Sequence, residues 1–136
     1  MEFEIHPKLV ASSIEIGRFG GCRLLLKNNS LFPWLLLVPE VEGMEDLHQL
    51  PQAQYEEVMA ATRKVSEFVA SYFQPEKLNV ACIGNIVRQM HIHIVGRSAG
   101  DPAWPATVWA HHGERLYCEE ESQKIRSAAR DFLGLA

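Results

Sequence analysis

Residues 89–95 read Gln89-Met90-His91-Ile92-His93-Ile94-Val95, and this alternation of polar and apolar residues decides the fold. Successive side chains on a β-strand point to opposite faces of the sheet. The alternating apolar residues therefore share one face, while Gln89, His91 and His93 share the other at a spacing of about 6.6 Å. The pattern predicts a strand with one face in the core and a row of polar groups on the other.

Two imidazoles on one strand face suit two kinds of chemistry. Neutral imidazoles bind transition metals, and His111 and His112 offer further ligands in a loop. An imidazole with a pKa near its reference value of about 6.5 is also a largely neutral nucleophile at pH 7, able to attack phosphorus. The residues alone therefore leave a metal site and a site of covalent catalysis both open.

The segments around this stretch predict four more strands. The pair Gly20-Gly21 separates two strand-like runs, which is typical of a β-hairpin. An apolar run bounded by Pro33 and Pro39 is typical of a strand buried on both faces. The turn Gly84-Asn85 separates the last two strands, which we expect to be antiparallel neighbours. The five expected strands span residues 13–19, 22–27, 34–38, 78–83 and 87–95.

Two longer segments carry the period of an amphipathic helix. In residues 51–73 apolar side chains recur at steps of three and four, and Pro51 suits the first turn. In residues 119–133 apolar side chains gather on one face, and Gly134 is placed to end the helix. Together these elements predict an α+β fold with about five antiparallel strands, one long central helix and a C-terminal helix. We expect a single domain over residues 1–136.

Composition and charge exclude several classes of protein. The 136 residues carry a formal net charge of −4 without a basic run, which argues against binding a nucleic acid polymer. The longest apolar stretch, residues 31–39, is too short to span a membrane, and the acidic N-terminus lacks the profile of a signal peptide. No GxGxxG or P-loop sequence is present. We therefore expect a cytoplasmic protein without a membrane or nucleic acid partner.

The stretch 89–95 resembles the signature of the histidine-triad (HIT) superfamily, in which three histidines alternate with apolar residues. Gln89 stands in the place of the first histidine. Other segments are similar to those of a bacterial HIT subgroup often labelled diadenosine tetraphosphate hydrolase-like. They are Phe32-Pro33-Trp34-Leu35, Gly84-Asn85 and Asp101-Pro102-Ala103-Trp104-Pro105. The resemblance covers roughly residues 13–105 and leaves residues 106–136 as a C-terminal loop and helix.

This resemblance implies a HIT-like fold and a nucleotide hydrolase or transferase. Such proteins cleave a dinucleoside polyphosphate or a nucleoside phosphoramidate at the α-phosphorus, through a covalent nucleotidyl-histidine intermediate, and release a nucleoside monophosphate. The resemblance further implies a purine nucleotide substrate of the adenosine type and a homodimer. It implies no cofactor and no metal ligands on the protein.

The resemblance also assigns roles to residues by their position in the motif. His91 is expected to be the nucleophile, and His93 to contact the phosphate or the leaving-group oxygen. Gln89 is expected to orient the phosphate, because a carboxamide cannot carry a proton in and out. The expected substrate-binding residues are Asn85 in the turn, Asn28 or Asn29 at the ribose, Arg97 at the phosphate if the strand continues that far, and Leu36 at the base.

Two alternatives from other classes stay open. A Gln in the first triad position allows a nucleotide-binding regulatory protein with weak or no catalysis. His91 and His93 by themselves allow a small metal protein. Retention of His91 favours the hydrolase over the regulatory protein, because a protein that only binds nucleotides does not need the nucleophile.

Overall fold

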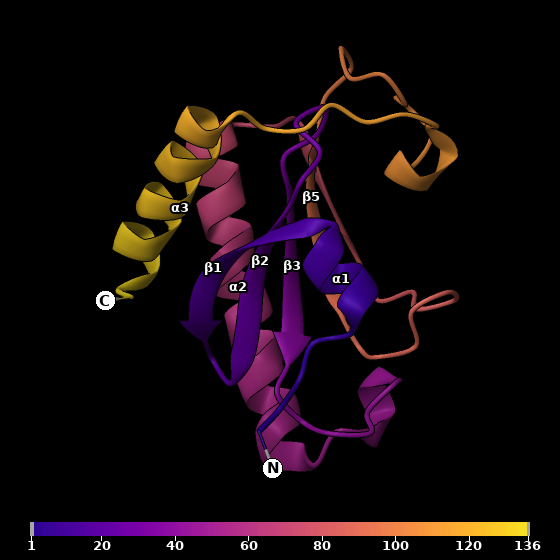
Figure 1. Ribbon diagram of the computed structural model, residues 1–136, viewed down its shortest axis with the longest axis vertical. Helices are drawn as coiled ribbons and strands as arrows, with labels where there is room; N and C mark the ends of the chain where they lie inside the picture. The colour runs from indigo at the N-terminus through magenta and orange to yellow at the C-terminus, as the bar shows by residue number, and fades with distance from the viewer. Residues whose placement is uncertain (1, 136) are drawn as a thin grey trace.

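The computed structural model describes residues 2–135, which build one sheet with helices on both of its faces (Figure 1). Five strands lie in the order β1-β2-β3-β5-β4, and every neighbouring pair is antiparallel. The predicted α+β fold is therefore confirmed. The strands are β1 (Ser13–Phe19), β2 (Cys22–Lys27), β3 (Trp34–Pro39), β4 (Lys77–Ala81) and β5 (Ile92–Arg97).

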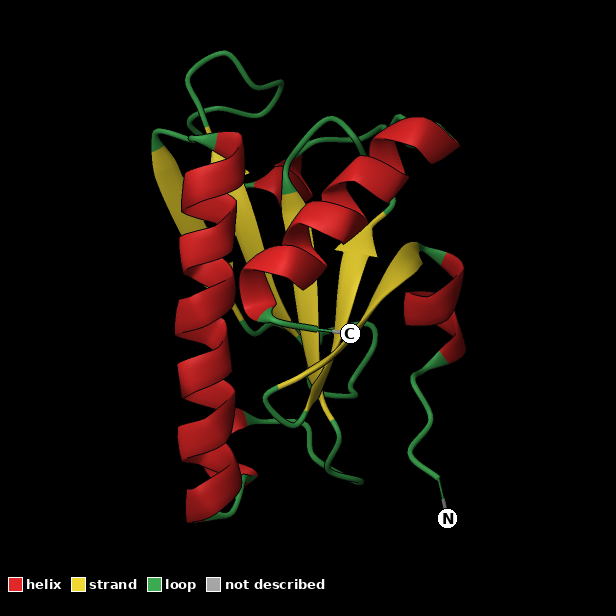
Figure 2. Cartoon of the chain, turned by 90° about the vertical axis from the view of Figure 1, so that its left-hand side faces the viewer, coloured by secondary structure: helices red, strands yellow, loops and turns green. Residues whose placement is uncertain are grey.

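Helices cover the sheet unequally. The long helix α2 (Gln52–Phe73) lies across one face, with α3 (Glu119–Leu133) beside it near β1, and the short helix α1 (Pro7–Ala11) lies on the opposite face (Figures 1 and 2). Two short 3₁₀ helices, η1 (Leu47–Gln49) and η2 (Val108–Ala110), interrupt the loops. None of the helices within residues 2–135 has the length and apolar character needed to cross a membrane.

Helix α1 was not predicted from the sequence. Five residues are too few to show a helical period, and the start signal is an unusual one. The Nδ1 atom of His6 accepts a hydrogen bond from the backbone N–H of Lys8 at 3.1 Å, and Pro7 occupies the first turn. The helix lies on the face of the sheet that carries the histidines.

The alternation of side chains along the strands divides the core into two layers. Apolar residues of one parity pack beneath α2, including Ile92 and Ile94 of β5. Residues of the other parity, including Leu36 and Val95, pack on the α1 side. The predicted orientation of β5 is confirmed in its second half, because His93 lies opposite the two isoleucines. The face that bears the imidazoles is therefore the α1 face.

The strand predicted over residues 87–95 is shorter at its start and longer at its end. Strand β5 begins at Ile92 and continues to Arg97. The backbone N–H of Met90 bonds to the carbonyl oxygen of Met44, in the segment after β3, and so does not join the ladder. The turn at Gly84 has a φ of +71°, and residues 82–91 are irregular. An alternating pattern shows where a strand can form, but not where its neighbour stops pairing with it.

Candidate active site

A cavity of about 740 Å³ opens on the α1 face of the sheet, a volume within the usual range for small-molecule sites. His91 and His93 line it, together with Leu36 from β3 and Asn85 from the turn. Lys8 of α1 and Lys27 of β2 also line it, whereas none of the acidic side chains in residues 2–135 does. The cavity therefore combines an imidazole pair with a local positive charge on an acidic chain.

The ring of His91 is held in one tautomer by a backbone carbonyl. Its Nδ1 atom lies 2.7 Å from the carbonyl oxygen of Gln89. A carbonyl oxygen can only accept, so Nδ1 carries the proton and Nε2 has a free lone pair in the neutral ring. Burial lowers the pKa of His91, outweighing the hydrogen bond to Gln89 that raises it, and the Lys27 charge lowers it further. His91 therefore presents an unprotonated nitrogen at neutral pH.

His93 is held in the opposite tautomer. The indole N–H of Trp34 donates to Nδ1 of His93 at 3.0 Å, so Nδ1 is the acceptor and Nε2 carries the proton. Burial lowers the pKa of His93 to about 3, and the neighbouring His91 and Lys27 charges act in the same direction. His93 is therefore a neutral ring with a fixed N–H donor.

The two rings make a complementary pair. Their centroids lie 4.7 Å apart, and the ring of Trp109 packs edge-on against His93 at 4.9 Å. One imidazole offers a lone pair and its neighbour offers an N–H group. This is the arrangement that attack on an electrophilic centre bearing oxygen atoms requires, because the donor stabilises the charge that develops on those oxygens.

The structure does not bring the side chain of Gln89 into this cavity. Its Oε1 atom accepts from the backbone N–H of His6 at 2.8 Å, and its Nε2 atom donates to the carbonyl oxygen of Glu4 at 2.9 Å. The prediction that Gln89 shares a strand face with the histidines is wrong, because β5 begins only at Ile92. Gln89 acts here through its backbone carbonyl on His91, while its side chain fastens the N-terminal segment.

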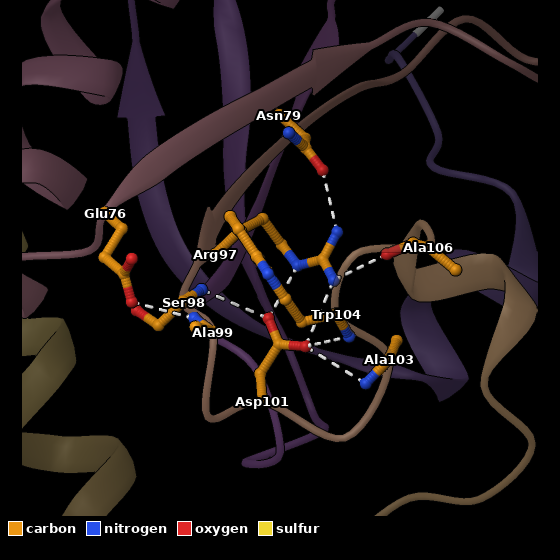
Figure 3. A network of polar contacts seen from close by, with 9 residues as sticks. All are labelled: Glu76, Asn79, Arg97, Ser98, Ala99, Asp101, Ala103, Trp104 and Ala106. Carbon is orange, nitrogen blue, oxygen red and sulfur yellow. Dashed lines mark hydrogen bonds and ion pairs between the residues drawn. The ribbon is translucent and has the colours of Figure 1, made fainter.

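Arg97 does not line the cavity, although β5 does extend to it. Figure 3 shows the polar contacts of Arg97 instead. Its guanidinium is buried and donates to both carboxylate oxygens of Asp101, to Oδ1 of Asn79 and to the carbonyl oxygen of Ala106. Three of these four bonds hold the loop after β5, and the fourth joins Arg97 to β4. The expected phosphate contact through Arg97 is therefore not supported, and its observed role is to hold this loop.

The remaining predicted residues divide into two groups. Asn85 and Leu36 line the cavity as expected. Oδ1 of Asn28 accepts from the backbone N–H of Tyr117, and Oδ1 of Asn29 accepts from those of Leu31 and Arg115. Both asparagines thus order the segment that leads to α3, and Asn29 lines a smaller cavity of about 290 Å³ beside Trp109.

Sequence reasoning missed the cavity residues that come from other elements. Trp34 and Lys27 occupy the ends of adjacent strands, and Lys8 belongs to the unpredicted helix α1. Strand parity offers a signal for two of them, since Lys27 shares a face with Leu25, and Trp34 shares one with Leu36. Trp34 lies within an apolar run and Lys27 at the end of one, so parity within each strand is what points to the histidine face.

The described part of the chain holds no set of side chains arranged to bind a metal ion. Within residues 2–135 no group of three or more His, Cys, Asp or Glu side chains comes together as metal ligands do. The ring of His111 packs edge-on against Phe32 and lines the smaller cavity. The alternative that combined His91 and His93 with the loop histidines is therefore not supported.

An antiparallel sheet that carries two histidines of opposite tautomer in a cavity on one face defines the class of protein. Residues 8–100 match the HIT domain family, and the chain belongs to that family. A histidine triad protein from Marinobacter aquaeolei is 34% identical with a TM-score of 0.94, and the match covers 100% of both chains. No protein with a curated description matches the chain.

Two further solved structures are similar over nearly the whole chain. A histidine triad protein from Sinorhizobium meliloti is 31% identical with a TM-score of 0.93, covering 96% of this chain and 97% of that one. A histidine triad protein from Bradyrhizobium japonicum is 32% identical with a TM-score of 0.94, covering 98% and 99%. The fold of the entire described chain is thus shared with proteins that carry the family's name.

Proposed function

We propose that this protein is a nucleotide hydrolase or transferase that cleaves at the α-phosphorus of a dinucleoside polyphosphate or nucleoside phosphoramidate. The single observation that carries the proposal is the tautomer of His91, whose Nδ1 faces the Gln89 carbonyl and whose Nε2 is left free. An unprotonated imidazole nitrogen in a cavity is suited to covalent catalysis at phosphorus.

The reaction proceeds in two displacements. Nε2 of His91 attacks the α-phosphorus, a bond forms between that nitrogen and phosphorus, and the bond from phosphorus to the leaving group breaks. The electron pair stays on the bridging oxygen of a polyphosphate, whereas the nitrogen of a phosphoramidate takes up a proton from solvent and leaves as an amine. The imidazole becomes positively charged, and the Gln89 carbonyl accepting from Nδ1 stabilises that charge. Water then displaces His91 from phosphorus, releases its extra proton to solvent and yields a nucleoside monophosphate.

His93 stabilises the phosphorane-like transition state of both steps by hydrogen bonding. Its Nε2–H group is fixed as a donor by Trp34 and would donate to the phosphoryl oxygens of a substrate in the cavity. As a neutral ring it does not deliver a proton, so its contribution is electrostatic. The apolar side chain of Leu36 in the same cavity suits the base of a purine nucleotide of the adenosine type.

The working unit that we propose is a homodimer joined through β4. Strand β4 ends the sheet on one side, whereas the other edge strand, β1, receives Arg130 of α3 on the carbonyl oxygen of Ile16. Val80, Ile83 and Ile86 are exposed on β4 and the loop after it. An uncovered edge strand with exposed apolar side chains favours pairing with a second copy.

A nucleotide-binding regulatory role is the second candidate. It is favoured by the position of Gln89, whose side chain bonds to the backbone of the N-terminal segment. Only two of the three triad residues, His91 and His93, therefore line the cavity. Incubation with diadenosine tetraphosphate and adenosine 5′-phosphoramidate, in the presence of a chelator, distinguishes the two functions. A hydrolase releases AMP, and substitution His91→Ala abolishes the release. Binding without any release of AMP would favour the regulatory role.

A further inference from the structure

Lys27 lies at the junction of two cavities. The cavity of about 740 Å³ that holds the histidines and the cavity of about 290 Å³ beside it share three lining residues, Lys27, Trp34 and Trp109. Lys27 therefore borders both the space around His91 and the smaller space beside it. A leaving group that extends from a phosphorus at His91 toward the smaller cavity would come close to Lys27.

The ammonium group of Lys27 is held at this junction without a carboxylate partner. Nζ lies 5.5 Å from the centroid of the Trp34 ring, within the range of a cation–π contact. Among the ion pairs of residues 2–135, none involves Lys27 within 4.0 Å. Trp34 touches both Lys27 and His93, so the charge stands one side chain away from the imidazole pair.

The charged side chains that line the larger cavity all carry positive charge. Lys8 and Lys27 line the larger cavity, and no acidic side chain of residues 2–135 lines it. Glu114 faces Lys27 from the smaller cavity and lies beyond ion-pair distance. Partial burial lowers the pKa of Lys27, and the Glu114 charge raises it. An unpaired, half-buried ammonium beside a phosphate site is suited to a second anionic group.

The two classes of leaving group make different demands on the site. An amine expelled from a phosphoramidate needs a proton as the bond from phosphorus to nitrogen breaks. A polyphosphate leaves as a stable anion and needs only compensation of its charge. Gln89 does not reach the cavity and His93 is a neutral donor, so this site supplies charge compensation and lacks an evident proton donor.

We infer that Lys27 binds the first phosphate of an anionic leaving group and so selects nucleotide phosphoanhydrides over phosphoramidates. The inference rests on the proposed function. In the first displacement the bond between the α-phosphorus and the bridging oxygen breaks, the electron pair stays on that oxygen, and Lys27 offsets the resulting negative charge. The new bond from His91 to phosphorus takes its place.

The test compares two substrates on one variant. Lys27→Gln keeps a polar side chain that is one atom shorter and removes the charge. The expected result is a loss of about 10–100-fold in kcat/KM for diadenosine tetraphosphate, the effect of one charge-assisted hydrogen bond. For adenosine 5′-phosphoramidate we expect kcat/KM to change by less than about threefold. Its leaving group is an amine without negative charge, so Lys27 makes no charge contact with it. Lys124→Gln, on the exposed surface of α3, is the matched control.

A binding experiment separates this inference from the proposed function. In the His91→Ala protein, ATP should bind more tightly than AMP, and Lys27→Gln should remove that difference. Glu114→Gln should increase it, because the carboxylate no longer competes for the ammonium. Equal losses on both substrates, or an unchanged preference for ATP, would overturn the role of Lys27. Failure of the wild-type protein to hydrolyse either substrate would overturn the proposed function and leave the binding result to decide on Lys27.

Discussion

At the scale of single residues, hydrogen-bond partners decide which nitrogen of each imidazole carries a proton. The Gln89 carbonyl keeps the proton of His91 on Nδ1, and the indole of Trp34 keeps that of His93 on Nε2. The same motif with different partners would offer two acceptors or two donors. The chemistry of the pair therefore depends on Trp34 as much as on the histidines.

Substitution Trp34→Phe tests this dependence. The variant loses the indole donor, so His93 should populate both neutral tautomers, and kcat should fall by about tenfold, or ~1.4 kcal/mol in the barrier. Nitrogen chemical shifts of the His93 ring report the tautomer directly by NMR. The control is Trp109→Phe, because Trp109 packs on His93 without a hydrogen bond to it. In this variant the shifts should still report the tautomer of His93 that is protonated at Nε2. Unaltered shifts in Trp34→Phe would contradict the assigned role.

The low pKa of His93 predicts how stability depends on pH. In the unfolded chain this imidazole takes up a proton near pH 6.5, whereas in the folded protein its pKa is about 3. The unfolded state therefore binds more protons between these values, and the stability of the protein falls as the pH is lowered through this window. The slope from one such group is about 1.4 kcal/mol per pH unit. Urea unfolding between pH 7 and 4 should show a shallower decline for His93→Asn than for the wild type, and parallel curves would refute the shift.

At the scale of elements, the loop after β5 is fastened by a buried ion pair. Burial acts to raise the pKa of Asp101, but hydrogen bonds from Arg97 and from the backbone N–H groups of Ser98, Ala103 and Trp104 outweigh it and lower the pKa to about 2. The guanidinium also stacks over Phe32 and Trp104. The loop continues into η2, which places Trp109 against His93.

Arg97→Gln should therefore be costly. The change leaves the Asp101 carboxylate without its charged partner, for which about 3–5 kcal/mol of the free energy of unfolding is the expected loss. Arg88→Gln is the matched control, because it removes an exposed pair with Glu45 that contributes at most about 1 kcal/mol. Chemical denaturation measures both. A loss for Arg97→Gln no larger than the control would contradict the structural role.

The extent to which these elements follow from the sequence can be traced to particular residues. The hairpin around Gly20-Gly21 and the long helix were predictable because local turn chemistry and a helical period set them. The faces of Ile92 and His93 followed from parity within one strand. The position of Gln89 did not, because it depends on Met90 bonding to Met44 and on an N-terminal segment more than 80 residues away. Long-range pairings of this kind leave no periodic trace in the sequence.

At the scale of the whole molecule, the sheet ends on one side in β4, where Val80 and, in the loop after it, Ile83 and Ile86 are exposed. Extension across β4 would join two five-stranded sheets into one and bury the exposed apolar side chains of that edge. A second copy would also lie near the turn that contains Asn85, since this turn follows β4.

Sedimentation of the wild-type protein at micromolar concentration should give a particle of twice the 15.4 kDa chain mass. Val80→Lys places a charge on the exposed face of the edge strand and should shift the population toward the monomer. Leu116→Lys, at an exposed apolar position away from β4, should remain dimeric. A wild-type particle of the mass of one chain would refute pairing through β4.

The covalent role of His91 is the central claim, and it is tested by rapid quenching after mixing the protein with diadenosine tetraphosphate in the presence of chelator. Mass spectrometry should find an adenylyl group on the peptide that contains His91. His91→Ala should lack the adduct and turn over more slowly by roughly 10⁴–10⁶-fold, the scale seen for other covalent nucleophiles, while AMP still binds. A His91→Ala protein that releases AMP at the wild-type rate would contradict the account.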